Sequence, residues 1–165
     1  MSAARFQQQG FQLGEFLPYL VNRVGVHMVR VFTPELERFG VSLGMWRVLA
    51  ALWQADGVRL VDLAHRTSME VSTLSRTVAA LRRRGLVRSG RNGSNGGDAR
   101  TVQIALTAKG RAFTAQIIPV ALEYEARMVV DIPPRERTEL RRLLKRVYGN
   151  LDRLDTPPAH ASAGD

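Results

Sequence analysis

Hydrophobic residues recur every three or four positions along most of this chain, which is the spacing of one face of an α-helix. In the first helix that this pattern predicts, the apolar positions are Leu17, Leu20, Val21, Val24, Met28, Val31 and Phe32. Because proline lacks a backbone donor and crowds the preceding turn, this helix is expected to end near Thr33-Pro34. A second helix is predicted after Ser42, whose hydroxyl can cap its first turn. Its apolar side carries Met45, Trp46, Leu49, Leu52 and Trp53.

The C-terminal third of the chain predicts two more helices. Thr107 can cap the first, and Pro119 should kink it. Its apolar positions are Phe113, Ile117, Leu122 and Met128. After a break at Asp131-Ile-Pro-Pro134, a charged helix follows with a narrow apolar stripe of Leu140, Leu143, Leu144, Val147, Leu151 and Leu154. Residues 155–165 have too little apolar content to fold, so they are expected to form a disordered tail.

Two shorter helical patterns lie in the middle of the chain, separated by a tight turn. The first has Leu60, Leu63 and Ala64 at helical spacing, and Thr67-Ser68 then interrupts it. In the second, the apolar stripe consists of Leu74, Val78 and Leu81. Off that stripe stand Ser72, Thr73, Ser75 and Arg76. Small hydroxyl side chains with one arginine are suited to contact base edges and phosphates.

A β-hairpin is predicted directly after these two helices. Gly85 can stop the second helix, and Leu86-Val87-Arg88 reads as the start of a strand. The segment 89–97 is rich in glycine and asparagine, and the segment 101–106 alternates apolar and polar residues. The order helix, turn, helix, hairpin predicts a winged helix-turn-helix in a mainly α fold with a two-stranded β wing. In such a unit the second helix enters the major groove, and the hairpin reaches the adjacent backbone or minor groove.

The net charge is concentrated in the same region. Nine of the 24 basic residues and one of the 15 acidic residues lie between positions 76 and 111, so these 36 residues carry +8 of the formal net charge of +9. A concentrated positive charge is typical of a site for a polyanion. The alternative is that an arginine run at the end of a helix is only a solvated face.

No pattern of residues predicts a catalytic or metal site. The sequence contains no P-loop, dinucleotide fingerprint or nucleophile elbow, and its three histidines, His27, His65 and His160, are scattered. The chain has no cysteine, which excludes a thiol redox sensor. It also lacks the long apolar stretch of a secretory signal or a membrane span. We therefore expect a cytoplasmic protein that is not an enzyme and needs no cofactor.

Several short motifs in this order resemble the MarR family of bacterial transcription regulators. They are Leu63-Ala64, Ser72-Thr-Leu-Ser-Arg76, Gly85-Leu-Val87, Asp98-Ala-Arg100 and Leu106-Thr107-x-x-Gly110. With the flanking helices, the resemblance covers residues 10 to 154. Three features depart from the usual pattern: Ser68 stands where a turn glycine is common, Arg59 stands where a Ser or Thr cap is common, and the glycine-rich wing tip is a little longer than average.

The resemblance implies roles in DNA binding for three groups of residues. Ser72, Thr73, Ser75 and Arg76 form the recognition helix, and Arg91, Asp98 and Arg100 belong to the wing. Arg82, Arg84 and Arg88 are expected to contact phosphates. An arginine in a narrow minor groove is favoured by the negative potential there, and a nearby carboxylate can orient it. Asp98 is expected to do this for Arg100, although a surface ion pair of little consequence is the alternative.

The resemblance also implies a pocket for a small-molecule effector, where the dimerisation helices meet the winged unit. The residues expected there are Arg23, His27, Met45, Trp46 and Arg47. An aromatic ring flanked by cations could hold an aromatic acid or an acyl-CoA. The alternative is that Met45 and Trp46 are core residues and that His27 lies on the surface or in an interface.

The first and last helices extend beyond the winged unit and need a partner for their apolar stripes. We expect residues 10–40 and 111–154 to form an isologous homodimer around DNA-binding domains of residues 41–110. Packing back onto their own winged unit is the alternative. The expected function is a sequence-specific repressor that an anionic or aromatic effector releases from a pseudo-palindromic operator on double-stranded DNA. A non-specific DNA-coating or architectural protein without an effector is the alternative.

Overall fold

The computed structural model describes residues 10–55, 57–91 and 102–155, and the fold is mainly helical, as predicted. The elements are η2 (Leu13–Glu15), α1 (Leu17–Glu37), α2 (Leu43–Trp53), β1 (Val58–Arg59), α3 (Leu60–Thr67), α4 (Val71–Arg83), β2 (Val87–Arg91), β3 (Val102–Leu106), α5 (Ala108–Met128) and α6 (Pro134–Asp155). They form two compact units, which divide between Leu122 and Glu123 within α5.

The predicted end of the first helix at Thr33-Pro34 is wrong, because α1 continues through Pro34 to Glu37. Phe32 and Leu36 on either side of the proline are buried, and their burial stabilises the last turn. The Thr33 hydroxyl also donates to the carbonyl oxygen of Val29 at 2.7 Å. A single missing backbone donor near the end of a helix is therefore outweighed by packing.

The predicted helix caps at Ser42 and Thr107 are both confirmed. The backbone N–H of Met45 donates to the Ser42 hydroxyl at 3.2 Å, and the backbone N–H of Gly110 donates to the Thr107 hydroxyl at 2.9 Å. Each hydroxyl satisfies one of the backbone donors that lack a partner in the first turn of a helix. These caps fix the starts of α2 and α5.

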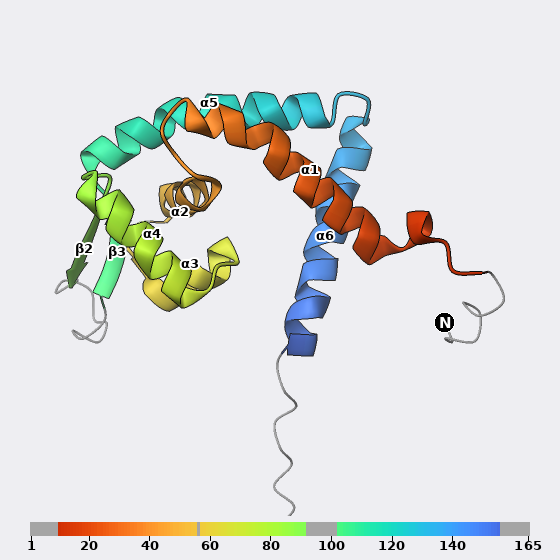
Figure 1. Cartoon of the computed structure of the whole chain (residues 1–165), viewed down its shortest axis with the longest axis horizontal. Helices are drawn as coiled ribbons and strands as arrows, with labels where there is room; N and C mark the ends of the chain where they lie inside the picture. The colour runs from red at the N-terminus through yellow and green to blue at the C-terminus, as the bar shows by residue number, and fades with distance from the viewer. Residues whose placement is uncertain (1–9, 56, 92–101, 156–165) are drawn as a thin grey trace, which may run out of the picture. The chain divides into compact units, whose positions relative to one another are not determined.

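The helix-turn-helix consists of α3 and α4, and the predicted turn lies between them (Figure 1). Ser68 ends α3 in the left-handed conformation, with a φ of +50°. Its N–H donates to the His65 carbonyl at 3.2 Å, and the Met69 N–H donates to the Ala64 carbonyl at 3.0 Å. This explains why glycine suits the position: the turn requires a conformation that a Cβ disfavours.

The core of the first unit lies among α2, α3, α4 and the sheet. The largest side chains with almost no exposed surface include Leu36, Leu49, Leu52, Leu63, Leu74, Leu81, Leu86 and Ile117. The stripe predicted for the second short helix is confirmed, because Leu74, Val78 and Leu81 of α4 are all buried. The opposite side of α4 is therefore free to face a ligand.

The sheet has three antiparallel strands in the order β1-β3-β2, where the sequence predicted only the two strands of the hairpin. In the hairpin, Val87 pairs with Leu106 and Arg91 pairs with Val102. The additional strand β1 is only two residues long, and its Val58 pairs with Ile104. A strand this short has no alternating pattern from which it could be predicted.

The second unit consists of the end of α5 and the helix α6. Arg141 pairs with Glu125 at 2.6 Å, and Arg142 pairs with Glu139 at 2.6 Å. The apolar stripe of α6 is exposed on this single chain, with Leu140 at 41%, Leu144 at 46% and Leu151 at 56%. None of the helices in the described ranges is long and apolar enough to cross a lipid bilayer.

Candidate nucleic-acid interface

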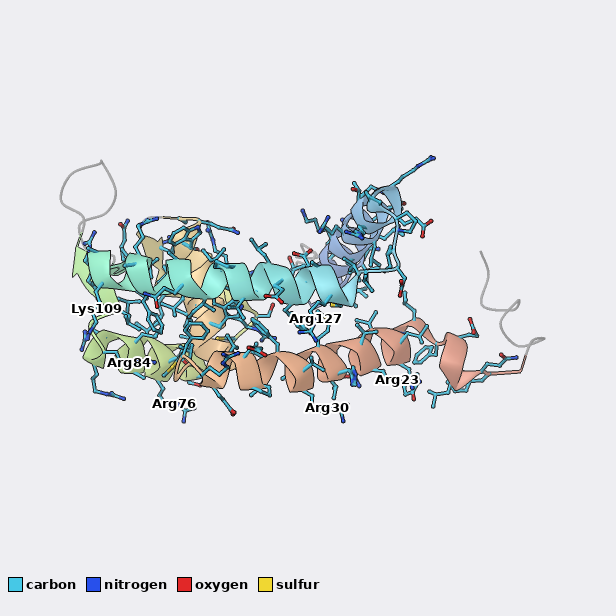
Figure 2. The ribbon with its side chains drawn as sticks, turned by 90° about the horizontal axis from the view of Figure 1, so that it is seen from above. Arg23, Arg30, Arg76, Arg84, Lys109 and Arg127 are labelled. Atoms are coloured by element: carbon cyan, nitrogen blue, oxygen red, sulfur yellow. The ribbon has the colours of Figure 1, made fainter. Side chains whose placement is uncertain are left out.

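The residues predicted for the recognition helix lie together on the exposed side of α4. Ser72, Thr73, Ser75 and Arg76 are all exposed. The buried stripe on the other side fixes which way these side chains face. Figure 2 shows Arg76 extending outward from the helix. The sequence pattern thus located a polar surface that a ligand can reach.

Two contacts arrange the polar side chains along this surface. The Arg76 Nε donates to the Ser72 carbonyl oxygen at 3.4 Å, and the Thr77 hydroxyl donates to the Thr73 carbonyl oxygen at 2.9 Å. The Arg76 side chain is therefore held toward the first turn of α4. Since the Nε contact uses only one of five N–H donors, the others remain available for a ligand.

The electrostatics of the first turn of α4 favour an anion. This turn contains no acidic residue, and the N-cap Glu70 makes no side-chain hydrogen bond to the helix. The backbone N–H groups at the start of a helix lack intrahelical partners and carry partial positive charge. A phosphate or an electronegative base edge can accept from them. The helix start and the Arg76 side chain therefore both favour an anion at this end of α4.

The wing begins from β2 and β3, and its predicted contact residues lie largely beyond what the structure describes. Arg88 is exposed on β2, where it pairs with Ala105 of β3. The backbone of Arg91 ends β2, but the position of its side chain is outside the described residues, as are Asp98 and Arg100. Their roles in the wing stay predictions.

Among the three residues predicted to contact phosphates, Arg84 is placed differently from Arg82 and Arg88. Arg82 and Arg88 are exposed, whereas Arg84 is half-buried. The Arg84 Nη1 donates to the Gly40 carbonyl oxygen at 2.7 Å, and its Nη2 donates to the Phe39 carbonyl oxygen at 3.4 Å. These bonds hold the guanidinium against its own chain, so we do not carry Arg84 forward as a phosphate contact.

A bidentate ion pair stands at the start of α3. Arg59 binds both carboxylate oxygens of Asp62, through Nε at 2.7 Å and Nη2 at 2.9 Å. This hydrogen bonding lowers the pKa of the Asp62 carboxyl below its ordinary value, and the charges of Arg59 and nearby Arg66 act in the same direction. Arg59 occupies the position where a Ser or Thr cap is common. It contacts the first turn of α3 through the side chain of Asp62 and does not cap a backbone N–H.

The residues predicted for an effector pocket do not all come together. A cavity of about 410 Å³ lies between α2 and the end of α3. Its lining consists of Trp46, Arg47, Ala50, Ala51, Gln54, Arg66, Thr67 and Ser68. Of the five predicted residues, only Trp46 and Arg47 line it. The lining also includes Arg66 and Gln54, which the sequence did not point to, because no periodic pattern shows which residues of α2 face the end of α3.

The other three predicted pocket residues have different surroundings. His27 and Arg23 are exposed on α1, and the Arg30 Nη2 lies 3.2 Å from the His27 Nδ1. Met45 is half-buried, with its Sδ 3.9 Å from the Arg84 Nη1. Trp46 also packs edge-on against Phe32 of α1, with ring centroids 6.2 Å apart. One side of Trp46 is thus a core contact, and another borders the cavity.

A family model described as the MarR family matches residues 41–96 of the chain. This match covers α2, α3, α4 and β2, and so includes the exposed polar side of α4. Among curated proteins, an HTH-type transcriptional repressor of Mycobacterium tuberculosis is 26% identical over 131 residues, which is 79% of this chain and 92% of the repressor.

Two solved structures have a similar fold. A MarR-family transcriptional regulator from Silicibacter pomeroyi has a TM-score of 0.75 and 29% identity, covering 91% of this chain and 96% of the regulator. Bordetella bronchiseptica BpsR, whose DNA binding is regulated by 6-hydroxynicotinic acid, has a TM-score of 0.73 and 23% identity, covering 84% of this chain and 96% of BpsR. Because BpsR is only 23% identical to this chain, its similarity shows the fold alone.

Proposed function

We propose that this chain is a member of the MarR family of transcription regulators and that it acts as a dimeric, sequence-specific repressor released from its operator by an aromatic acid. One observation carries the proposal for DNA reading. The exposed side of α4 presents small hydroxyls and one arginine, with no acidic residue in its first turn. Such a surface matches the donors and acceptors of the major groove.

In this proposal, the contacts with DNA come from three places. Ser72, Thr73, Ser75 and Arg76 read bases in the major groove, where arginine pairs best with guanine. Arg82 and Arg88, which are exposed, contact phosphates. Arg100, oriented by Asp98, enters the minor groove from the wing, with Arg91 near the same backbone.

The exposed apolar residues of the terminal helices support a homodimer. Val21 and Val24 of α1 are 43% and 55% exposed, and the α6 stripe is exposed to a similar extent. Exposed apolar stripes of this kind, on α1 and on α6 separately, are typical of interaction sites. We propose that residues 10–40 and 111–154 dimerise and that residues 41–110 bind DNA. Two reading helices about one helical turn apart would then match a pseudo-palindromic operator.

The cavity between α2 and α3 supports an anionic aromatic effector. Arg47 and Arg66 both line it, and neither makes a hydrogen bond or ion pair with another described residue. They can bind a carboxylate, and the Trp46 ring offers an aromatic contact. A volume of about 410 Å³ suits a small aromatic acid better than an acyl-CoA. BpsR, which responds to 6-hydroxynicotinic acid, provides the chemical precedent.

A selection from random duplex DNA tests the central proposal. The full-length protein is bound to the pool at near-physiological salt, and the retained fraction is sequenced. We expect a two-fold-related motif with half-sites about one turn apart. A retained pool that stays random, with affinity falling steeply as salt rises, would instead support the alternative of a non-specific DNA-coating protein.

A further inference from the structure

Arg84 joins the end of α4 to segments that lie far from it in the sequence. Its two terminal nitrogens donate to the carbonyl oxygens of Gly40 and Phe39, at 2.7 and 3.4 Å, in the loop between α1 and α2. Its guanidinium carbon also lies 5.3 Å from the centroid of the Phe113 ring in α5. A single side chain at the end of α4 thus contacts both the α1–α2 loop and α5.

The same end of α4 is also held from the side of α5. The Lys109 Nζ donates to the Arg84 carbonyl oxygen at 3.0 Å, where Figure 2 labels both side chains. The Thr107 hydroxyl donates to the Gly85 carbonyl oxygen at 2.7 Å. The Phe39 and Phe113 rings meet edge-on, with centroids 6.5 Å apart. The end of α4, the α1–α2 loop and the start of α5 are therefore joined by several contacts, and the Arg84 guanidinium takes part in those with both neighbouring segments.

The geometry requires the planar guanidinium. Arginine can donate two hydrogen bonds from one rigid fork while its face lies against an aromatic ring, which an ammonium group cannot do. The neighbouring Arg83 has the same charge but is exposed, and it forms no hydrogen bond or ion pair within the described part of the chain. The two arginines are therefore a matched pair, in which only Arg84 is held by other segments.

We infer that Arg84 is a positioning residue: it fixes the direction of α4 relative to the α1–α2 loop and α5. We proposed that α1 and α5 contribute to the dimer, so these helices would set the distance between the two α4 helices. Through Arg84, the same helices would also set the direction of each α4. The functional consequence rests on the proposed function, since it takes α4 as the DNA-reading helix. The positioning itself is a property of one chain.

A distance measurement tests the positioning without DNA. Since the chain has no cysteine, Val71→Cys and Gln116→Cys provide unique spin-label sites on exposed residues of α4 and α5. Labelled chains are mixed with an excess of unlabelled chains, so that pulsed electron resonance reports the distance within one protomer. We expect Arg84→Ala to shift or broaden this distance distribution and Arg83→Ala to leave it unchanged.

Arg84→Lys covers the case in which Arg84→Ala does not fold. It keeps the charge and loses the fork, so it should still broaden the distribution, and circular dichroism checks that the helices remain. A folded Arg84 variant whose distance distribution matches that of the wild type would overturn the inference.

The salt dependence of operator binding separates positioning from phosphate contact. We expect Arg84→Lys and Arg84→Ala each to weaken operator binding about tenfold, as for loss of a charged hydrogen bond, with an unchanged slope of log affinity against log salt. A slope for Arg84→Ala that is reduced by about one would assign Arg84 to a phosphate and overturn the inference. If the wild type selects no operator, the proposed function fails, while the distance measurement still decides the role of Arg84.

Discussion

The side chain of Arg76 turns back along α4 and places its Nε 3.4 Å from the carbonyl oxygen of Ser72. This contact directs the side chain toward the first turn of the helix, where Ser72 and Thr73 are also exposed. Because base reading requires donors held in a fixed direction, this contact favours a role in specificity rather than in general attraction to DNA.

Arg76→Ala should reduce discrimination between the operator and random DNA. The loss on the operator is expected to be about tenfold or more, as for one good base contact, with a smaller loss on random duplexes. Competition binding at fixed salt measures both affinities. An equal loss on both kinds of DNA would show that Arg76 contacts a phosphate.

Arg100→Ala should weaken operator binding by more than about tenfold, because a minor-groove arginine contributes on the scale of one groove contact. Asp98→Ala should have a smaller effect in the same direction, since its proposed role is to orient the arginine. Titration of labelled operator at constant ionic strength gives both dissociation constants. An unchanged constant for Arg100→Ala would contradict the proposed role of the wing.

Gly110→Ala should destabilise the fold by about 2 to 3 kcal/mol, because a Cβ at this position would collide with the carbonyl group of Leu86. Gly149→Ala in α6 is the matched control. A Cβ there meets nothing within 4 Å, so replacing a helical glycine should slightly stabilise the protein. Urea denaturation of both variants measures the free energy of unfolding. Similar values for the two variants would show that the contact between α5 and the Leu86 backbone can relax.

Leu144→Glu should shift the protein from dimer to monomer, because it places a charge in the apolar stripe that we propose is covered by the second chain. The Leu144 side chain is 46% exposed on a single chain, so the variant should still fold. Sedimentation velocity measures the assembly, and Lys145→Glu is a control for the charge on the neighbouring, more polar position. A monomeric wild type would instead favour terminal helices that pack on their own chain.

Arg47→Ala and Arg66→Ala should each weaken binding of an aromatic carboxylate about tenfold, since each removes one charged partner of the carboxylate. Isothermal titration with 6-hydroxynicotinic acid gives the affinity, and the corresponding amide tests the need for the negative charge. Arg30→Ala on α1, outside the cavity lining, is the control. Equal binding of the acid and the amide would exclude the two arginines as its carboxylate site.

The parts of the fold that sequence could predict are those in which one periodic pattern decides the structure. Leu74, Val78 and Leu81 recur at helical spacing, so both the existence of α4 and the direction of its polar side followed from them. The caps at Ser42 and Thr107 could be predicted because a cap depends only on residues within one turn. The strand β1 could not, since two residues show no alternation and pairing with β3 creates the strand.

The parts of the site that sequence could not predict depend on contacts between distant segments. Arg82, Arg83 and Arg84 are equivalent by composition, and only the positions of Phe39, Gly40 and Phe113 distinguish Arg84. The cavity likewise forms where α2 meets the end of α3. No pattern in the sequence could therefore predict that Arg47 and Arg66 both line it. For the same reason, Pro34 could stay in α1, because burial of Leu36 is a tertiary effect.

At the left-handed turn of Ser68, a substitution can change the stability of this protein without changing the residues proposed to recognise DNA. A residue with a Cβ is disfavoured at a φ of +50° by about 1 kcal/mol, and glycine is not. The chain thus keeps a less favourable residue at the corner between two helices, next to the surface proposed to read DNA but not among the residues proposed to touch it. Thermal tolerance could therefore be raised at this corner while the set of recognised sequences stays the same.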